Sequence, residues 1–260
     1  MQIKRLGNTD LLVSRIGLGT VKFGRNQQVK YPQAFELPTD KAILDLLAYA
    51  EEQGINFLDT APAYGVSEER LGQLLGNQRH NWVLATKVGE EFINGQSHFD
   101  FTSAHTRYSV ERSLKRLNTD FLDIVLVHSN GEDKKIIEET DIFETLNTLK
   151  QSGKIRAFGM STKTIDGGKL VVDLSDIVMV TYNPIETAEQ PVIAYAQQKN
   201  KGVLIKKSLA SGHLQKMTGK DPVRTAIQFI FQEPGVNSII LGTLNKDHLA
   251  HNIQCTEAVT

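Results

Sequence analysis

The 260-residue chain has little cysteine, no long apolar run and almost no net charge, and each of these absences narrows its class. A single cysteine, Cys255, excludes an intramolecular disulfide framework and is typical of a reducing compartment. No apolar run approaches the ~20 residues of a membrane span, and residues 1–20 lack the apolar core of a signal peptide. With 29 basic and 30 acidic residues, no overall charge attracts nucleic acid. We therefore expect a cytoplasmic protein that binds neither nucleic acid nor membranes.

Several common catalytic motifs are also absent. Gly17 and Gly19 are followed by Thr20 and Val21, so the glycine fingerprint of a Rossmann dinucleotide site is incomplete. The chain has no P-loop, no Gly-x-Ser-x-Gly elbow and no His-Glu-x-x-His zinc helix. The seven histidines show no metal-ligand spacing, and a lone cysteine argues against a thiolate metal site. The sequence therefore predicts no metal centre.

Short β-rich runs alternate with longer amphipathic segments along the whole chain. The strand-like runs are residues 13–18, 56–59, 82–87, 121–128, 155–161, 177–181, 202–206 and 238–241. Several are almost entirely apolar, which is typical of strands buried on both faces of a parallel sheet. Residues 1–9 resemble a short extra β element ahead of these units. Each of the eight strands is followed by a helical pattern, and no linker divides the chain.

The expected helices carry apolar residues every three or four positions. The clearest patterns cover residues 110–117 and 142–149, and a further helix starts at Thr39 and closes at Gly54. Weaker helices are expected at residues 68–75, 164–173, 191–199, 221–231 and 246–256. Eight strand–helix units predict one α/β domain over residues 1–260, a (β/α)8 barrel; an open doubly wound sheet is the alternative.

Polar residues end successive strand-like runs. Asp59, Lys87 and His128 end the second, third and fourth runs. The next three end at Ser161, at residues 181–183, and at Lys206 with Lys207. In a (β/α)8 barrel the carboxyl ends of the strands form the active site, and strand interiors reject unpaired charge. We therefore expect these side chains to face one polar mouth.

Several segments that carry these residues resemble the aldo-keto reductases, from about Ile3 to Asn252. The segment GINFLDTAPAYG at residues 54–65 is similar to the family signature, in which Asp and Tyr stand five residues apart. Lys87 in ATKV and His128 in LVH resemble the lysine of the third family strand and the histidine of the fourth. GKIRAFGMS at 153–161, YNP at 182–184 and the segment from 242 to 252 resemble later family segments. A short member that lacks the long C-terminal substrate loop is implied.

The resemblance implies reduction of an aldehyde, ketone or sugar carbonyl by a nicotinamide cofactor. Tyr64 would be the acid in reduction and the base in oxidation, and His128 would orient the carbonyl oxygen. A free tyrosine has a pKa of about 10, so a nearby cation is needed to stabilise the phenolate. Lys87 would supply that cation, and Asp59 would hold Lys87 by a salt bridge.

The family pattern also implies where the cofactor is held. Its expected contacts are Gly19, Thr20, Ser161, Asn183, Lys206, Ser208, Leu209, Ser211, Thr243, Asn245, Lys246, His248 and Asn252. Ser161 and Asn183 would lie near the nicotinamide, and the segments at 208–211 and 243–248 near the phosphates and adenosine, although Asn245 is also a suitable N-cap. Lys246 and His248 favour NADPH, with NADH as the alternative.

The chain departs from the family pattern at three positions. Thr162 stands where many relatives carry asparagine, and Met179 where a glutamine contacts the carboxamide. Lys206 replaces an aromatic residue that stacks on the nicotinamide. A lysine cannot stack in that way, so we expect it to reach a phosphate or to face the substrate.

Two connections bear on the substrate. The short polar connection from His213 to Pro222, and the end of the chain soon after the last helix, predict an open mouth with broad specificity. The loop at residues 22–38, with Phe23, Tyr31 and Phe35, either walls part of the mouth or is an ordinary long barrel loop. We expect a small-molecule partner and a monomer or weak homo-oligomer.

Two other functions fit the same barrel. A Schiff-base aldolase would use Lys87 or Lys206 to form an imine with a carbonyl substrate. A non-catalytic redox sensor would bind the nicotinamide without turnover.

Overall fold

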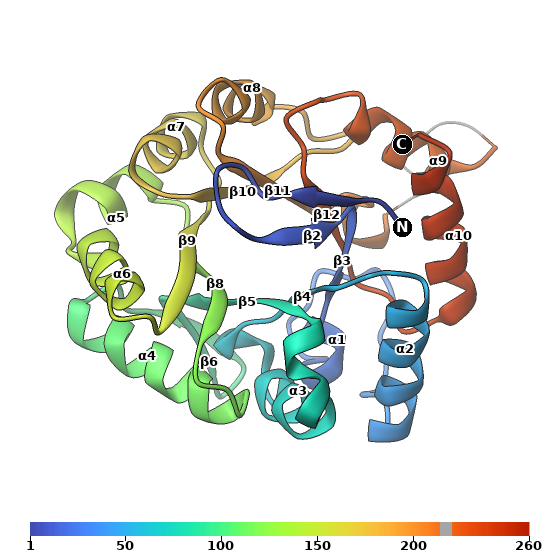
Figure 1. The fold of residues 1–260 in the computed structure, drawn as a ribbon, viewed down its shortest axis with the longest axis horizontal. Helices are drawn as coiled ribbons and strands as arrows, with labels where there is room; N and C mark the ends of the chain where they lie inside the picture. The colour runs from blue at the N-terminus through green and yellow to red at the C-terminus, as the bar shows by residue number, and fades with distance from the viewer. Residues whose placement is uncertain (214–219, 260) are drawn as a thin grey trace.

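The chain forms a closed barrel of eight parallel strands in a computed structural model that describes residues 1–213 and 220–259 (Figure 1). Around the ring, each strand pairs with the next in the order β3, β4, β5, β8, β9, β10, β11 and β12, and β12 closes onto β3. Their bounds are Ile16–Gly19, Phe57–Asp59, Val83–Val88, Leu122–His128, Ile155–Ser161, Ile177–Thr181, Gly202–Lys206 and Ser238–Leu241. The predicted (β/α)8 barrel is therefore confirmed.

Helices cover the outside of this ring (Figure 1). They are α2 (Asp40–Glu52), α3 (Ser67–Leu75), α4 (Ser103–Arg116), α6 (Ile142–Gln151), α7 (Ile165–Leu174), α8 (Gln190–Gln198), α9 (Pro222–Phe231) and α10 (Lys246–Glu257). Thr39 caps α2 as predicted, because its hydroxyl accepts the Ala42 N–H at 3.2 Å. Short turns are added at α1 (Val21–Gly24), α5 (Asp133–Glu139), η1 (Pro62–Tyr64), η2 (Gly76–Asn81) and η3 (Ala210–Gly212). Among the described residues, no helix has the length and apolar character needed to cross a membrane.

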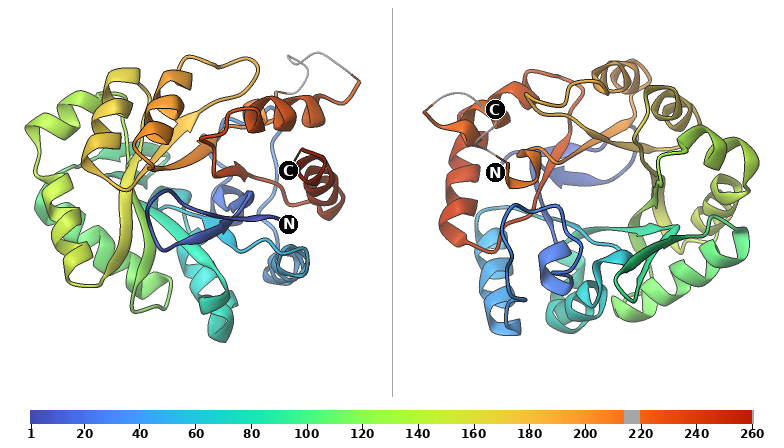
Figure 2. Two further views of the ribbon diagram at one scale, coloured as in Figure 1. Left: turned by 45° about the horizontal axis from the view of Figure 1, so that its top comes forward. Right: turned by 180° about the vertical axis from the view of Figure 1, so that it is seen from behind.

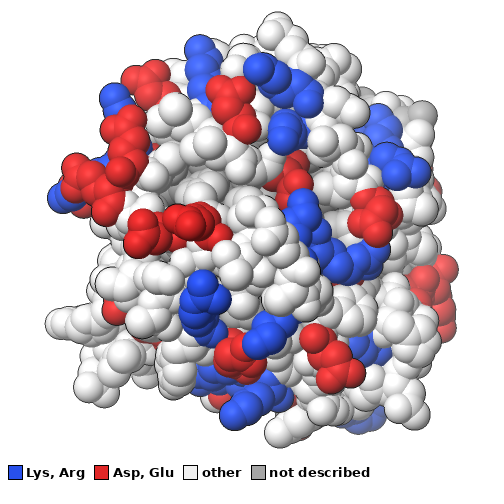
Figure 3. Space-filling view, turned by 60° about the vertical axis from the view of Figure 1, so that its left-hand side comes forward, with Lys and Arg blue, Asp and Glu red and all other residues white. Residues whose placement is uncertain are grey.

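The charged side chains of both signs are mixed on the outer surface. Figure 3 brings forward the left-hand side of Figure 1, and on this face basic and acidic groups alternate with uncharged surface. Many of them are paired, such as Lys154 with Glu111 and Lys150 with Asp176. Charges of both signs are therefore interspersed on this face.

The predicted first strand, residues 13–18, is wrong in its bounds, because it joins two strands. β2 (Leu12–Ser14) pairs antiparallel with β1 (Ile3–Arg5), and β3 begins only at Ile16. Arg15 separates them: its buried guanidinium donates to the Val236 carbonyl at 2.9 Å. The β element expected at the N-terminus is thus one arm of a hairpin.

This hairpin closes one end of the barrel. Leu6, Leu11 and Val13 are fully or almost fully buried and pack with residues from inside the ring, among them Phe57 and Leu204. In Figure 1 the hairpin lies across the barrel toward the viewer, and the view from behind in Figure 2 places it on the far side. Because it covers the amino ends of the strands, the polar mouth is at the opposite end.

A second hairpin was missed in the sequence. β6 (Glu90–Ile93) and β7 (Gln96–Phe99) pair antiparallel, and Ile93 faces Gln96 across the turn. The turn is formed by Asn94 and Gly95, which both have positive φ, at 52° and 79°. An Asn-Gly pair is a strong signal for this tight turn. The hairpin follows β5, so it begins beside the mouth.

Candidate active site

The candidate site is built around a buried ion pair between two neighbouring strands. Asp59 ends β4, and Lys87 lies near the end of β5; their side chains are 5% and 3% exposed. Lys87 Nζ donates to Asp59 Oδ1 at 2.7 Å and to the Thr60 carbonyl at 2.8 Å. Burial acts to lower the pKa of Lys87, but the Asp59 carboxylate and Tyr64 outweigh it and the pKa is raised. Lys87 is therefore an ammonium ion with a fixed position.

Tyr64 lies directly beside this ammonium group. It ends the short helix η1, and the Lys87 Nζ is 4.8 Å from the centre of its ring. Gly65 follows at φ 62°, and a Cβ there would collide with the Gly24 carbonyl oxygen, so this turn requires glycine. Burial raises the pKa of Tyr64 and outweighs the opposing charge of Lys87, with Asp59 adding to the rise. The phenol is therefore protonated at neutral pH, with a cation in place to stabilise its conjugate base.

His128 closes the cluster from the end of β8. Its ring meets that of Tyr64 edge-on, with the two centroids 6.3 Å apart. Its Nδ1 is 2.7 Å from Glu90 Oε2, at the start of the β6–β7 hairpin. Burial lowers the pKa of His128 and outweighs the opposing effect of Glu90, while the charges of Lys87 and Lys206 lower it further. The structure thus brings Asp59, Tyr64, Lys87 and His128 together at one mouth.

Glu90 belongs to this site, although sequence reasoning missed it. Burial acts to raise the pKa of its carboxyl, but His128, Ser97 and Arg25 together lower it to about 2. The hydroxyl of Ser97 donates to Glu90 Oε1 at 2.6 Å. Arg25 lies over the Phe92 ring at 3.4 Å and donates to the Ala63 carbonyl beside Tyr64. The Asn94-Gly95 turn was the available signal that a hairpin carries this carboxylate to the mouth.

Lys206 is held by oxygen atoms at and just after the end of β9. Its Nζ donates to Ser161 Oγ at 2.8 Å and to the Thr162 carbonyl at 2.5 Å. Burial lowers the pKa of Lys206 to about 8; Glu189 opposes this shift, and Lys207 and Lys163 add to it. The ammonium group therefore lies between the ends of β9 and β11 and within electrostatic reach of His128.

The expected cofactor residues in and beside the segment after β11 differ in how deeply they are buried. Asn183 is fully buried and donates its Nδ2 to the Lys207 carbonyl at 3.0 Å, which fixes that loop to the end of β10. Ser208 is buried and donates to the Ile240 carbonyl, whereas Leu209 is partly buried against the core. Ser211 has φ 55° within η3. Residues 214–219 of the predicted short connection lie outside the described residues.

The residues expected around the phosphates and adenosine lie at the start of α10. Asn245 acts as its N-cap, because Oδ1 accepts the N–H groups of Asp247 and His248 at 2.7 and 3.2 Å. Lys246 and His248 are exposed there. Thr243 is bonded to Asn245, whereas Asn252 is buried farther along the helix.

The two expected cofactor contacts at the end of β3, Gly19 and Thr20, differ in exposure to solvent. Gly19 ends β3 beside the mouth and is partly exposed. Thr20 is fully buried, and its hydroxyl donates to the Asp59 carbonyl at 3.0 Å while accepting a hydrogen bond from Ser67 at 2.8 Å.

Met179 is 2% exposed and packs inside the barrel, so its side chain contributes to the core.

The loop predicted at residues 22–38 begins only after α1 (Val21–Gly24), and residues 25–38 reach across the mouth. A Cβ at Gly242 would lie 2.6 Å from the Tyr31 hydroxyl, and one at Gly212 would lie 3.3 Å from Pro32. Lys22 packs beneath the Tyr31 ring, 4.1 Å from its centre. Burial and the charges of Tyr64 and Asp59 raise the pKa of Tyr31 to about 12. The loop therefore contacts both connections in which cofactor residues are expected.

The buried polar cluster lies at the carboxyl ends of the strands of a closed barrel, where (β/α)8 enzymes carry their active sites. The chain belongs to the aldo/keto reductase family, whose model matches residues 15–223. It is an NAD(P)H-dependent oxidoreductase of that family.

Known proteins agree with this assignment over most of the chain. A solved structure from Pseudomonas aeruginosa, assigned to the aldo-keto reductases, is 51% identical, has a TM-score of 0.91, and is matched over 99% of this chain and 94% of its own. The uncharacterized oxidoreductase YqkF of Bacillus subtilis is 29% identical over 99% of this chain and 92% of the relative. An NADH-specific methylglyoxal reductase of Escherichia coli is 31% identical over 70% of this chain and 59% of the relative.

Proposed function

We propose that the protein reduces small aldehydes and ketones, sugars included, to alcohols, with NADPH as the hydride donor and Tyr64 as the proton donor. The observation that carries this proposal is the position of Tyr64, whose ring lies 4.8 Å from Lys87 Nζ and 6.3 Å from the centre of the His128 ring. We further propose that it works in the cytoplasm as a monomer or weak homo-oligomer.

Each residue of the cluster has a task that follows from its surroundings. When bound, the nicotinamide supplies the hydride to the carbonyl carbon. Tyr64 gives its Oη proton to the carbonyl oxygen, and Lys87 stabilises the phenolate that remains until solvent returns a proton. Asp59 fixes Lys87. Glu90 lies 2.7 Å from Nδ1 of His128 and, as an ionised carboxylate, only accepts the proton of that nitrogen. Nε2 of the neutral ring therefore carries no proton, so His128 positions the carbonyl group by contact and donates to its oxygen only as the imidazolium.

The residues present fit a nicotinamide dinucleotide. Lys163, Lys206 and Lys207 lie close enough to repel one another electrostatically. For Lys163 and Lys206, burial is the larger cause of a lowered pKa, and repulsion by neighbouring lysines lowers it further. The phosphates of a dinucleotide would relieve this repulsion. The exposed Lys246 and the neighbouring His248 would face a ribose 2′-phosphate, which favours NADPH. The Escherichia coli relative is NADH-specific, so we expect measurable binding of NADH as well.

Comparison of Tyr64→Phe with the wild type tests the proposed mechanism. Fluorescence titration with NADPH and NADH measures binding, and the loss of NADPH absorbance with a reactive aldehyde measures turnover. We expect an unchanged Kd and a kcat lower by about 10²–10⁴-fold, which is the range for a lost general acid. Unchanged turnover would refute the role of Tyr64. Binding without turnover on any aldehyde in the wild type would favour the redox sensor.

One observation favours an aldolase as a second candidate. Burial lowers the pKa of Lys206 to about 8, so part of its amine is unprotonated and nucleophilic near neutral pH. Lys87 does not share this property, because its pKa is raised. Borohydride trapping of a carbonyl compound on Lys206, located by peptide mass analysis and absent from Lys206→Met, would support the aldolase.

A further inference from the structure

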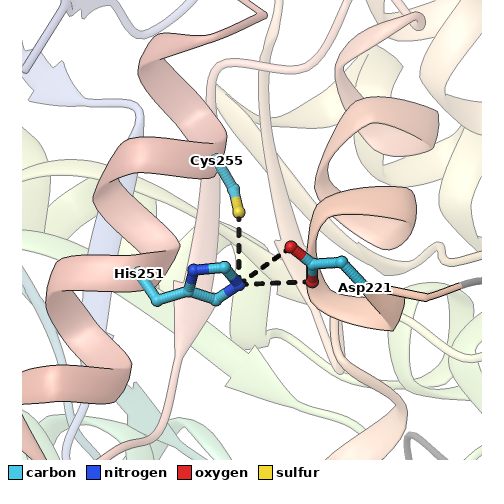
Figure 4. A group of neighbouring side chains, drawn as sticks. All are labelled: Asp221, His251 and Cys255. Atoms are coloured by element: carbon cyan, nitrogen blue, oxygen red, sulfur yellow. Dashed lines mark hydrogen bonds and ion pairs between the residues drawn. The ribbon is translucent and has the colours of Figure 1, made fainter.

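Three side chains of different metal-binding chemistry converge between α9 and α10, away from the strand ends. Asp221 is the N-cap of α9, and His251 and Cys255 lie one turn apart on α10. Each of the three offers one possible ligand atom for a metal ion, and these atoms all lie within 4.8 Å of one another (Figure 4). The sequence predicted no metal site, because the histidines lack metal-ligand spacing and there is a single cysteine; the fold brings Asp221 to His251 across 30 positions.

The contacts centre on a single ring nitrogen. His251 Nε2 is 3.2 and 3.1 Å from the two carboxylate oxygens of Asp221, and 3.6 Å from Cys255 Sγ. Figure 4 shows the thiol and the carboxylate both directed at this nitrogen. A nucleophilic triad needs the carboxylate on one ring nitrogen and the thiol on the other. Convergence on one nitrogen does not allow that relay, whereas three ligand atoms within 4.8 Å of one another can surround one cation.

The distances also match the edges of a tetrahedral zinc site. With Zn–N of about 2.05 Å, Zn–O of about 2.1 Å and Zn–S of about 2.3 Å, ideal angles place N and O about 3.4 Å apart and N and S about 3.6 Å apart. The observed separations are 3.1–3.2 Å and 3.6 Å. Two edges of the coordination tetrahedron are therefore already close to their required lengths.

One of the three side chains is buried, and the other two are partly exposed to solvent. Cys255 is fully buried, while the side chains of His251 and Asp221 are 41% and 32% exposed. An ion can enter from solvent, and water can occupy a fourth position. Arg224 is the competing cation, with its Nε 3.6 Å from Asp221 Oδ2. Its side chain is 49% exposed, so it can move into solvent when a metal binds.

We propose that Asp221, His251 and Cys255 bind one Zn²⁺ ion, with water as the fourth ligand, and that the ion ties the start of α9 to α10. Thiolate, imidazole and carboxylate together are typical zinc ligands. The thiol of Cys255 gives its proton to solvent as the Zn–S bond forms. The tie is separate from the proposed reduction, because it contains none of the residues assigned to that reaction.

Spectroscopy of the chelator-treated full chain tests the site. Titration with Co²⁺ should give one equivalent of binding, strong tetrahedral d–d bands and a thiolate-to-cobalt charge-transfer band, all removed by Zn²⁺. Cys255→Ser should lose the charge-transfer band, and Asp221→Asn should weaken Zn²⁺ binding about tenfold or more. Asparagine is also a good N-cap, so Asp221→Asn keeps α9 capped and separates metal binding from folding. His80→Gln, an exposed histidine on η2, is the matched control and should bind normally.

The single cysteine provides a second readout that does not depend on activity. Zn²⁺ should protect Cys255 from alkylation and raise Tm by several degrees in the wild type and in His80→Gln, but not in Asp221→Asn. Weak octahedral Co²⁺ spectra, a binding affinity equal in all variants, or unprotected alkylation at saturating Zn²⁺ would overturn the proposal.

Discussion

The buried pair of Asp59 and Lys87 should show strong energetic coupling. Their charged atoms are 2.7 Å apart, which corresponds to an attraction of about 6 kcal/mol at an effective dielectric constant of about 20. Much of this attraction offsets the hydration that both groups lost. Removal of one partner leaves a buried charge without its counterion and typically costs about 3–5 kcal/mol.

We therefore predict that Lys87→Met lowers the free energy of unfolding by about 3–5 kcal/mol, because Asp59 then lies unpaired. Asp59→Asn should cost less, since the amide oxygen and the Thr60 carbonyl still accept hydrogen bonds from Lys87. The double variant should be at least about 2 kcal/mol more stable than the sum of the two losses predicts. Urea unfolding, monitored by fluorescence, measures all four free energies.

The control is a pair with the same separation but greater exposure. Lys150 Nζ and Asp176 Oδ2 are also 2.7 Å apart, and the Lys150 side chain is 36% exposed. The cycle of Lys150→Met and Asp176→Asn should show a coupling of about 1 kcal/mol or less. Additive losses in the Asp59–Lys87 cycle, within about 0.5 kcal/mol, would refute the assignment of a tightly coupled buried pair.

Three further predictions concern other parts of the barrel. The pKa of Lys206 is lowered from 10.5 to about 8 in the folded protein. Burial of the charged amine therefore destabilises the folded state; this loss of stability is complete below pH 8 and disappears by about pH 10.5. Wild-type stability relative to Lys206→Met should thus rise through this window in urea unfolding, and a fall would contradict it. Glu90→Gln should lower the pKa of His128 further, since the carboxylate opposes the lowering by burial; NMR titration of the imidazole measures it, and a rise would count against their pairing. Gly159→Ala should cost about 1–3 kcal/mol of unfolding free energy, because its Cβ would collide with the Ile177 carbonyl oxygen; unchanged stability would show that the strands can separate there.

Much of the barrel was predictable because its strands are almost continuously apolar and several carry a polar residue at or near the end. That pattern singles out Asp59, Lys87 and His128 in the sequence, and the fold brings them together. The boundary at Arg15 was not predictable, because it depends on a hydrogen bond from its guanidinium to the distant Val236 carbonyl.

Other parts of the site depend on contacts that strand periodicity does not contain. Glu90 lies on a hairpin after β5, so the polar residues at strand ends do not include it. The Lys206 ammonium group binds oxygens of Ser161 and Thr162, two strands away around the ring. Strand periodicity does not contain these contacts, because they depend on how β9 and β11 are placed around the ring.

Closure of the ring has a consequence for how this chain folds during synthesis. β12 pairs with β3, and the Arg15 guanidinium binds the Val236 carbonyl across 221 positions of sequence. Contacts of such high sequence separation form slowly, because a long loop must close before they are gained. Until β12 leaves the ribosome, β3 and β11 present unpaired edges to other nascent chains. We expect refolding yields to fall with protein concentration, and substitutions in β12 to slow folding more than they speed unfolding if ring closure is the rate-limiting step.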